Sequence, residues 1–310
     1  MEKIKIFSPA TVANLVCGFD VIGLALNNPS DEILLKRSNK SGINILKIDG
    51  ADFPIDPNKN VCLVSLQKFI NECPFPSEIG FEIEILKKIK PGSGIGSSAA
   101  SSAGVVAGAN LLLGNTFSTL ELIRFAMEGE RLVSGGNHAD NVAPVLMGGI
   151  TLIRSYNPLE ITNIHVPNDL WISVIHPSIE IKTSDARKIL KKKVLMKDAI
   201  KQCGNFGSFI AGLYKVNYDL ISRSLEDVMV EPIRAMLITS FYKVKAKCQE
   251  VGALGGGISG SGPSIFMLSK GEKTAYIVSS VMEGIYDSLK IEYQVYTSSI
   301  NQKGLKWYKV

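Results

Sequence analysis

The chain has 310 residues, of which 45% are hydrophobic and 20% are charged, and its formal net charge is +5. This composition is typical of a soluble globular protein, and the dispersed lysines without aromatic neighbours argue against nucleic-acid binding. Five scattered cysteines without a C-x-x-C pair argue against a disulfide framework or a zinc site and favour a reducing cytoplasm. The longest apolar run, 99–113, is shorter than the roughly 20 residues of a membrane span.

Hydrophobic spacing predicts a mixed architecture. In the first half we expect strands at 3–7, 20–26, 31–37, 43–48, 80–86 and 148–153, and helices at 60–72, 97–113 and 118–133. After the break at Asn157-Pro158 we expect strands at 170–176, 264–268 and 291–297, and helices at 184–192, 197–213, 238–250 and 271–288. Strands and helices that cluster rather than alternate predict an α+β protein with two domains, 1–160 and 161–310.

The most informative segment is the glycine- and serine-rich run 91–104, PGSGIGSSAASSAG, which leads directly into a predicted helix beginning at Ser97 or Ser98. Glycine lets a ligand approach the backbone, and a helix N-terminus offers free N–H donors and partial positive charge. The run lacks the lysine of a Walker A loop and the spacing of a dinucleotide fingerprint. It predicts a phosphate site of another type, although turn geometry alone also explains such glycines. A second glycine-rich loop at 255–263 favours the phosphate reading.

Polar groups are concentrated at 128–141. A nucleoside triphosphate requires Mg²⁺, which takes hard oxygen ligands, so Glu130 and the Ser98 hydroxyl are candidate ligands. Taken alone, Glu130 equally fits a surface carboxylate, and His138 a plain loop residue. Asn14 and Asp20 occur in a turn-rich segment, and isolated arginines at 187 and 234 can each bind a carboxylate or simply face solvent.

Taken together, these motifs resemble those of the GHMP small-molecule kinases and, within them, the homoserine kinase branch. The matching segments occur in the family's order over nearly the whole chain: SPATVAN (8–14) with Gly18-Phe19-Asp20, the run 91–104, SGGNHADNVAP (134–144), Thr183-x-x-x-Arg187, Glu231-Pro-x-Arg234, and 255–263. Ile95 departs from the leucine that is usual in the family, and both side chains are apolar.

The resemblance implies an N-terminal domain of the ribosomal-protein-S5 type and a C-terminal ferredoxin-like domain. It implies ATP-dependent phosphorylation of the side-chain hydroxyl of L-homoserine to O-phospho-L-homoserine, on the route to threonine, by a homodimer. It places Mg²⁺ on Ser98 and Glu130. It places ATP over Asn60, Val61, Pro91, Gly92, Ser93, Gly94, Ile95, Gly96, Ser97, Ser98, Ala99, Ala100, Ser101, Gly260 and Ser261.

The resemblance also implies a substrate site formed by Asn14, Asp20, His138, Asp140, Asn141, Thr183, Arg187 and Arg234, and catalytic roles for Asn141, Glu130, Ser98 and Asp20. Asn141 would align the hydroxyl. Phosphoryl transfer proceeds through a loose transition state, so a phosphate oxygen can take the proton without a strong base. Asp20 or Asp140 would either assist that transfer or bind the substrate ammonium.

Three other functions stay open at this point. The first is another GHMP kinase that acts on a different alcohol, such as a mevalonate-like acid. The second is a non-catalytic regulator that binds a nucleotide or metabolite on the same scaffold, and an intact phosphate loop with Glu130 argues against it. The third is a plain P-loop NTPase, which the missing lysine opposes.

Overall fold

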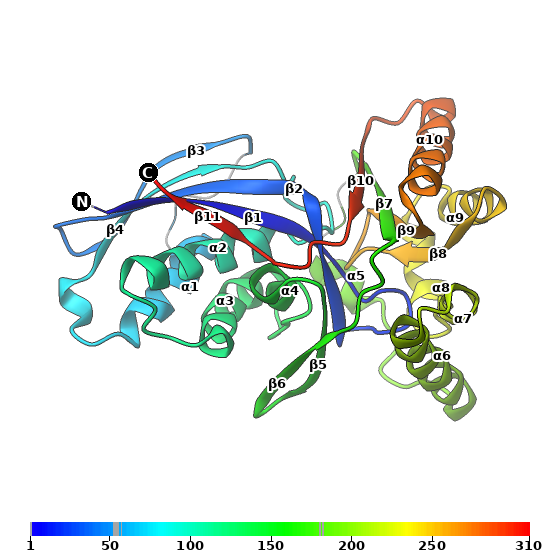
Figure 1. The fold of residues 1–310 in the computed structure, drawn as a ribbon, viewed down its shortest axis with the longest axis horizontal. Coiled ribbons are helices and arrows are strands. Elements are labelled where there is room, and N and C mark those ends of the chain that lie inside the picture. Colours follow the sequence, from blue (N-terminus) through cyan, green and yellow to red (C-terminus); the bar gives the residue numbers. More distant parts are fainter. Residues whose placement is uncertain (1, 52–55, 57, 180, 182) are drawn as a thin grey trace.

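The computed structural model describes residues 2–51, 56, 58–179, 181 and 183–310, and in this part of the chain the elements form two lobes, each built on one β-sheet (Figure 1). The sheet of the first lobe has the strand order β11-β1-β2-β4-β3, and β5 and β6 extend it from β2. Its strands are β1 (Lys3–Ala13), β2 (Ile22–Arg37), β3 (Gly42–Asp49), β4 (Gly80–Leu86), β5 (Ile150–Tyr156), β6 (Leu159–Ile164) and β11 (Lys306–Lys309).

The helices of the first lobe cover one face of this sheet (Figure 1). They are α1 (Val61–Asn71), α2 (Ser97–Leu112), α3 (Thr119–Ser134) and α4 (Val142–Met147), with a 3-10 turn at Pro76–Glu78. Helix α2 is the central one, and its small side chains let it pack closely on the sheet. A Cβ at Gly104 would lie 2.5 Å from Ile33 Cδ1, and one at Gly108 would lie 2.4 Å from Ile6 Cδ1. Nearly all residues of α2 are buried, so the helix has no face of exposed polar side chains.

The second lobe has an antiparallel sheet with the order β10-β7-β9-β8. Its strands are β7 (Leu170–Pro177), β8 (Ala253–Ile258), β9 (Ile265–Lys270) and β10 (Tyr293–Ser299). Its helices are α5 (Thr183–Lys188), α6 (Met196–Lys215), α7 (Tyr218–Ser224), α8 (Glu231–Arg234), α9 (Phe241–Glu250) and α10 (Glu272–Leu289), with a 3-10 turn at Ala235–Leu237. Side chains from both lobes share one apolar cluster, in which Leu24 and Ile95 meet Val174 and Phe266.

The α+β prediction is confirmed, and most predicted elements occur within a few residues of their expected bounds. The strands expected at 20–26 and 31–37 are one strand, β2, which pairs with β1 along most of its length with one irregularity at Pro9–Thr11. The pattern did not predict β6, β8, β11, α4, α7 or α8. Strand β8 was missed because its sequence, ALGGGI, is rich in glycine, which weakens any strand signal.

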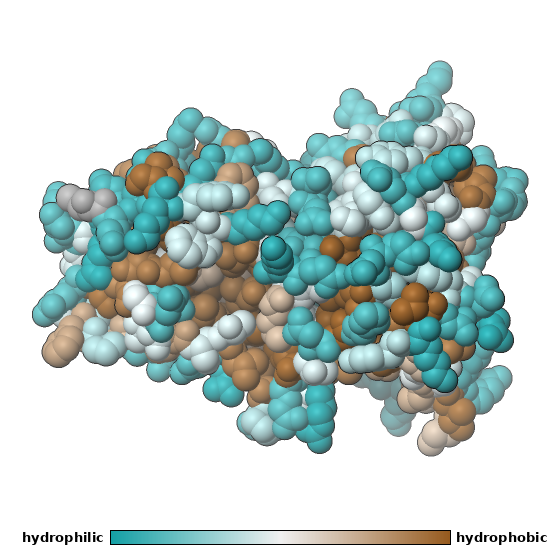
Figure 2. All heavy atoms as spheres, in the orientation of Figure 1, coloured by the Kyte–Doolittle hydropathy of each residue, from teal (hydrophilic) through white to brown (hydrophobic). Residues whose placement is uncertain are grey.

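The C-terminal end of the chain returns to the first lobe, where β11 pairs antiparallel with β1 and the two chain ends lie near each other (Figure 1). The predicted domain boundary at residue 160 stays a prediction. The face drawn in Figure 2 carries many hydrophilic side chains, with apolar areas over the lower part of the first lobe and near the middle of the molecule. Among the described helices, none has the length and apolar character needed to cross a membrane.

Candidate active site

The phosphate loop 91–96 ends where α2 begins, at Ser97 as predicted. The residue before the helix, Gly96, has φ +71°, and no side chain caps the helix, so its first N–H groups remain directed out of its N-terminus. A Cβ at Gly96 would lie only 1.9 Å from Thr11 Oγ1. Glycine is therefore required here by backbone conformation and packing before any ligand is considered.

The second glycine-rich loop holds the first one in place. Ser264 Oγ donates to the Ser93 carbonyl at 2.6 Å, and Ser259 Oγ donates to the Gly94 carbonyl at 2.7 Å. Gly94 packs so tightly here that a Cβ would lie 2.6 Å from the Gly262 carbonyl oxygen. The second loop thus fixes the shape of the phosphate loop from the second lobe.

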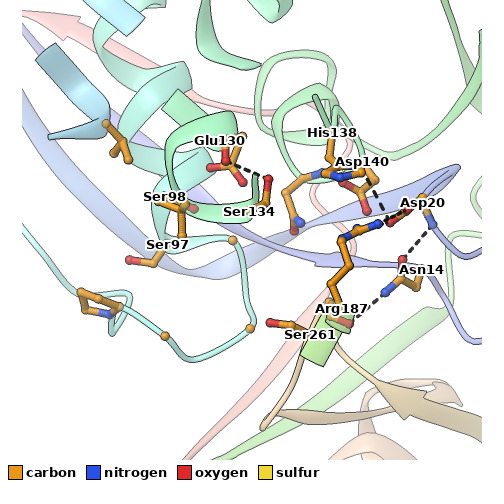
Figure 3. A pocket seen from close by; sticks show the side chains of 18 of the residues that line it. Asn14, Asp20, Ser97, Ser98, Glu130, Ser134, His138, Asp140, Arg187 and Ser261 are labelled. Atoms are coloured by element: carbon orange, nitrogen blue, oxygen red, sulfur yellow. Dashed lines mark hydrogen bonds and ion pairs between the residues drawn. The ribbon is translucent and has the colours of Figure 1, made fainter. Parts of the chain in front are cut away.

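A pocket opens at the N-terminus of α2, between the two lobes (Figure 3). It is lined by Asn14, Asp20, Lys59, Val61, Pro91, Gly92, Gly94, Gly96, Ser97, Ser98, Glu130, Val133, Ser134, His138, Asp140, Asn141, Arg187, Arg234, Gly260 and Ser261. Lys59, Val133 and Ser134 were not predicted. The structure thus brings most of the predicted residues to one place, although they come from segments spread over 250 residues of sequence.

Some predicted ATP-binding residues lie behind the pocket wall. Ser93, Ile95, Ala99, Ala100 and Ser101 are buried and do not line the pocket. Asn60 is the N-cap of α1, where its Oδ1 accepts from the N–H groups of Cys62 and Leu63 at 2.9 and 3.2 Å. Thr183 is the first residue of α5, and its side chain lies outside what the structure describes.

Glu130 lies on α3 and points into the pocket near Ser98 (Figure 3). Its carboxyl is buried, and Oε1 has no hydrogen-bond partner among the described residues. Burial raises the pKa of Glu130 to about 7, against the opposing effects of a hydrogen bond from Ser98 and the positive charge of Lys87. An oxygen that is buried and unpartnered is suited to a cation, and Mg²⁺ needs only one or two protein oxygens besides phosphates and water.

Lys87 is a buried cation beneath the first turn of α2 that sequence reasoning missed. It forms an ion pair with the buried Asp31, and its Nζ donates to the Ser97 carbonyl at 3.0 Å and to Ser101 Oγ at 2.9 Å. The Asp31 carboxylate also accepts from two backbone N–H groups at 2.8 and 2.9 Å. This network fixes the start of α2. No sequence pattern pointed to this network, because a lysine next to a strand is usually exposed.

The segment that carries Asn14 and Asp20 is held in a strained conformation. Asn14, Leu15 and Val16 have consecutive positive φ values of 76°, 38° and 67°, and Asp20 has 61°. Such values are rare for residues with a Cβ and persist only where surrounding contacts enforce them. Here Asn14 Oδ1 accepts from the Asp20 N–H at 3.0 Å, and Asn14 Nδ2 donates to the Gly260 carbonyl at 2.9 Å.

Charged side chains gather at the end of the pocket away from α2. Arg187 forms a bidentate pair with Asp20, with both N–O distances at 2.9 Å. Arg234 is almost fully buried; its Nε donates to the Ala186 carbonyl at 3.0 Å and its Nη1 to the Gly260 carbonyl at 3.1 Å. Burial, together with the charge of Arg187, lowers the pKa of Arg234 to about 10, so the guanidinium remains cationic at neutral pH.

Asp140 and His138 line the same end of the pocket, near Arg187 (Figure 3). Burial, and then the charges of Asp20 and Glu130, raise the pKa of Asp140 to about 7. Burial lowers the pKa of His138, so its imidazole is neutral near pH 7, and its Nδ1 lies 3.9 Å from Asp20. This end of the pocket therefore has two cations and two carboxylates within reach of one small ligand.

The side chain of Asn141 is oriented by Thr11, a second residue that sequence reasoning missed. Thr11 Oγ1 donates to Asn141 Oδ1 at 2.7 Å, and Thr11 is fully buried. With Oδ1 engaged, the amide presents its Nδ2 group to the pocket as a hydrogen-bond donor. The two residues are 130 positions apart, and no local pattern links them.

Comparison with known proteins agrees with this geometry. Residues 60–149 match the GHMP kinases N-terminal domain, and residues 196–287 match the GHMP kinases C-terminal domain. Over 315 residues the chain is 41% identical to the homoserine kinase of Chloroherpeton thalassium, covering 98% of this chain and 99% of that protein. It is 42% identical over 318 residues to the homoserine kinase of Chlorobaculum tepidum, with 99% and 98% covered.

The chain belongs to the homoserine kinase family of GHMP kinases. The crystal structure of homoserine kinase from Cytophaga hutchinsonii superposes with a TM-score of 0.94 at 46% identity and covers 99% of this chain and 98% of that one. Mevalonate kinase from L. major, solved with R-mevalonate, has a TM-score of 0.72 at 16% identity over 96% of each chain, a likeness of fold. The two-domain GHMP kinase fold expected from the sequence is confirmed.

Proposed function

We infer that this chain transfers the γ-phosphoryl group of ATP to the side-chain hydroxyl of L-homoserine and forms O-phospho-L-homoserine, a precursor of threonine. Similarity to homoserine kinases over the whole chain supports this reaction. The observation in the structure that carries it is a single pocket with a phosphate-type helix N-terminus at one end and Asp20, Asp140, Arg187 and Arg234 at the other.

The two ends of the pocket suit the two reactants. We propose that the phosphates of ATP lie against the backbone of 92–98, where the α2 N–H groups and helix dipole favour negative charge. The amino acid lies at the charged end, with its carboxylate near Arg187 and Arg234 and its ammonium near Asp20 and Asp140. Its hydroxyl then extends toward Asn141, between these groups and the phosphate loop.

Glu130 and Ser98 fit the Mg²⁺ that accompanies ATP. The described residues contain no cluster of three or more His, Cys, Asp or Glu placed around one cation, so the phosphates must supply much of the coordination. Mg²⁺, when bound there, neutralises charge on the phosphate oxygens. The buried, unpartnered Oε1 of Glu130 gives it a ready oxygen ligand.

Asn141 positions the hydroxyl and does not remove its proton, because an amide nitrogen cannot act as a base. The hydroxyl oxygen forms a bond to the γ-phosphorus as the bond to the β–γ bridging oxygen breaks, and ADP leaves. In a loose transition state the proton departs late, and an oxygen of the transferred phosphoryl group can accept it. Alignment and charge neutralisation therefore account for most of the catalysis.

The function is tested by ADP release with Mg-ATP and a panel of homoserine, mevalonate, galactose and shikimate. We expect strong turnover with L-homoserine alone. Turnover with another member of the panel and none with homoserine would overturn the substrate assignment.

A homodimer and a cytoplasmic location without nucleic-acid partners, as expected from the sequence, remain proposals. Light scattering tests the oligomeric state, fractionation tests the location, and RNA-binding assays test for nucleic-acid partners.

We expect Thr11→Val to lower kcat by roughly 10-fold, the cost of about one hydrogen bond, while the KM for ATP stays unchanged. Valine keeps the shape of threonine but cannot hold Asn141 Oδ1, so the amide loses its fixed orientation. Thr11→Ser keeps the hydroxyl and is expected to retain most activity. Steady-state kinetics check both variants, and a loss in Thr11→Ser without a loss in Thr11→Val would mean that the methyl group, not the hydrogen bond, matters.

The raised pKa of Asp140 predicts that catalytic efficiency falls at low pH, which gives an acid limb in the profile of kcat/KM against pH. Its pKa in the folded protein is about 7, above the usual 3.8, so below pH 7 the carboxyl is neutral and cannot attract the ammonium. We expect kcat/KM for homoserine to fall as pH drops through about 7, where Glu130 is protonated as well, and Asp140→Asn to make this limb shallower and to remove most activity. A limb of unchanged steepness in Asp140→Asn would assign it to Glu130 alone.

The raised pKa of Asp140 also predicts that replacing this residue stabilises the fold at high pH. The raised pKa means that ionised Asp140 destabilises the folded state, a cost that is absent below about pH 4 and complete above about pH 7. Asp140→Asn should therefore unfold at a higher temperature than the wild type at pH 8, with little difference near pH 4. Thermal unfolding at the two pH values measures this difference.

A further inference from the structure

The ion pair between Asp20 and Arg187 joins the two lobes across the pocket (Figure 3). Asp20 lies on the strained segment that follows β1, and Arg187 lies on α5. The side chain of Asp20 is 26% exposed and that of Arg187 is 34% exposed, and both line the pocket. The two groups best suited to bind opposite ends of an amino acid therefore pair with each other.

The surroundings make this pair costly to separate without replacement. The hydrogen bonds from Arg187 to Asp20 are bidentate, the strongest geometry for such a pair. The Phe19 ring lies 5.6 Å from the guanidinium carbon of Arg187 and limits its access to water. The remaining nitrogen, Nε, is buried without a partner among the described residues. A charge left unpaired in such a site loses the favourable interaction and is poorly solvated.

Arg234 differs from Arg187 in this respect. Its Nε and Nη1 hold backbone carbonyls of Ala186 and Gly260, so its position does not depend on a carboxylate partner. Arg187 must exchange its partner to bind a substrate carboxylate with the same two nitrogens, whereas Arg234 keeps its anchors. The exchange at Arg187 is therefore the step at which ligands can be distinguished.

We propose that the Asp20–Arg187 ion pair selects for zwitterions, because only a ligand with both an ammonium and a carboxylate replaces both partners at once. This inference rests on the proposed function and concerns how the same site rejects other alcohols. Homoserine exchanges one internal ion pair for two ion pairs with the ligand. A hydroxy acid takes Arg187 but leaves Asp20 unpaired, and an amino alcohol does the reverse.

Two analogues of homoserine isolate each charge. 4-Hydroxybutanoate lacks the ammonium, and 3-aminopropan-1-ol lacks the carboxylate. In the wild type both should bind poorly. In Asp20→Asn, Arg187 is no longer held by a carboxylate, so we expect 4-hydroxybutanoate to bind several-fold more tightly than in the wild type, while homoserine binds at least about 10-fold more weakly. If Asp20 only binds the ammonium, the affinity for 4-hydroxybutanoate will not change.

Binding is measured by calorimetry in the presence of a non-hydrolysable ATP analogue, so that a catalytic contribution of Asp20 cannot affect the result. Arg187→Gln provides the reciprocal test and should strengthen binding of 3-aminopropan-1-ol while weakening that of homoserine. Glu160→Gln is the matched control, because it breaks the surface ion pair of Arg154 and Glu160 and should change no affinity. Thermal unfolding verifies that each variant is folded.

The outcomes separate this proposal from the proposed function. If wild-type protein fails to phosphorylate homoserine, the proposed function fails. If it phosphorylates homoserine but neither Asp20→Asn nor Arg187→Gln gains affinity for its matched analogue, the ion pair is not a selectivity device. A gain in either folded variant, absent in Glu160→Gln, supports the proposal.

Discussion

Replacing Glu130 with glutamine is expected to lower turnover by about 10²-fold or more, the scale of losing one preorganised electrostatic group. Glutamine keeps the size of the side chain but removes the negative charge that would hold Mg²⁺. The Mg²⁺ concentration needed for half-maximal rate should rise as well. Because burial already penalises the ionised carboxyl and raises its pKa to about 7, the neutral variant should be at least as stable as the wild type. Lost activity would then not reflect unfolding.

Glu128→Gln is the matched control for this prediction. Glu128 lies on the same helix but is more exposed, and it pairs with Arg131 at 3.1 Å across one helical turn. Surface pairs of this kind contribute little, so the control should retain wild-type turnover and Mg²⁺ dependence. If Glu130→Gln behaves like Glu128→Gln, Glu130 is a structural carboxylate and the metal site must be sought elsewhere in the pocket.

The sequence could predict the phosphate loop because its information is local. Glycines with positive φ and the start of a helix of small residues all lie within 91–104, and the structure places α2 where this pattern indicated. The resemblance to a known family also ordered the candidate charged groups along the chain. Their assembly in one pocket between two lobes required the fold.

What could not be predicted depends on contacts between distant segments. The hydrogen bond of Thr11 to Asn141 spans 130 residues, and the Lys87–Asp31 pair spans 56. Neither leaves a periodic trace, because a contact between two distant segments does not alter the local pattern of either one. The strained φ values of Asn14 to Val16 are likewise imposed by the contacts of Asn14 with Asp20 and Gly260. Local propensity would not assign Leu15 or Val16 a left-handed conformation.

Arg234→Leu is expected to lower kcat/KM for homoserine by roughly 10²-fold or more, because breaking a buried charge pair costs about 2–5 kcal/mol. The structure suggests two ways in which Arg234 can support the use of homoserine, and an experiment must separate them. Its guanidinium lines the pocket, where it can meet the substrate carboxylate, and its Nε holds the Ala186 carbonyl next to Arg187. The KM for ATP should change little, because the phosphate loop lies at the other end of the pocket. Arg223→Leu, on the surface of α7, is the control.

A substrate without a carboxylate distinguishes the two contributions. If Arg234 binds the carboxylate directly, 3-aminopropan-1-ol should be poor with the wild type and lose little more with Arg234→Leu, which gives a large coupling energy in a double-mutant cycle. If Arg234 acts only by anchoring α5, the variant should harm homoserine and 3-aminopropan-1-ol equally. Equal losses for the two substrates would remove Arg234 from the carboxylate site and leave Arg187 as the partner of that group.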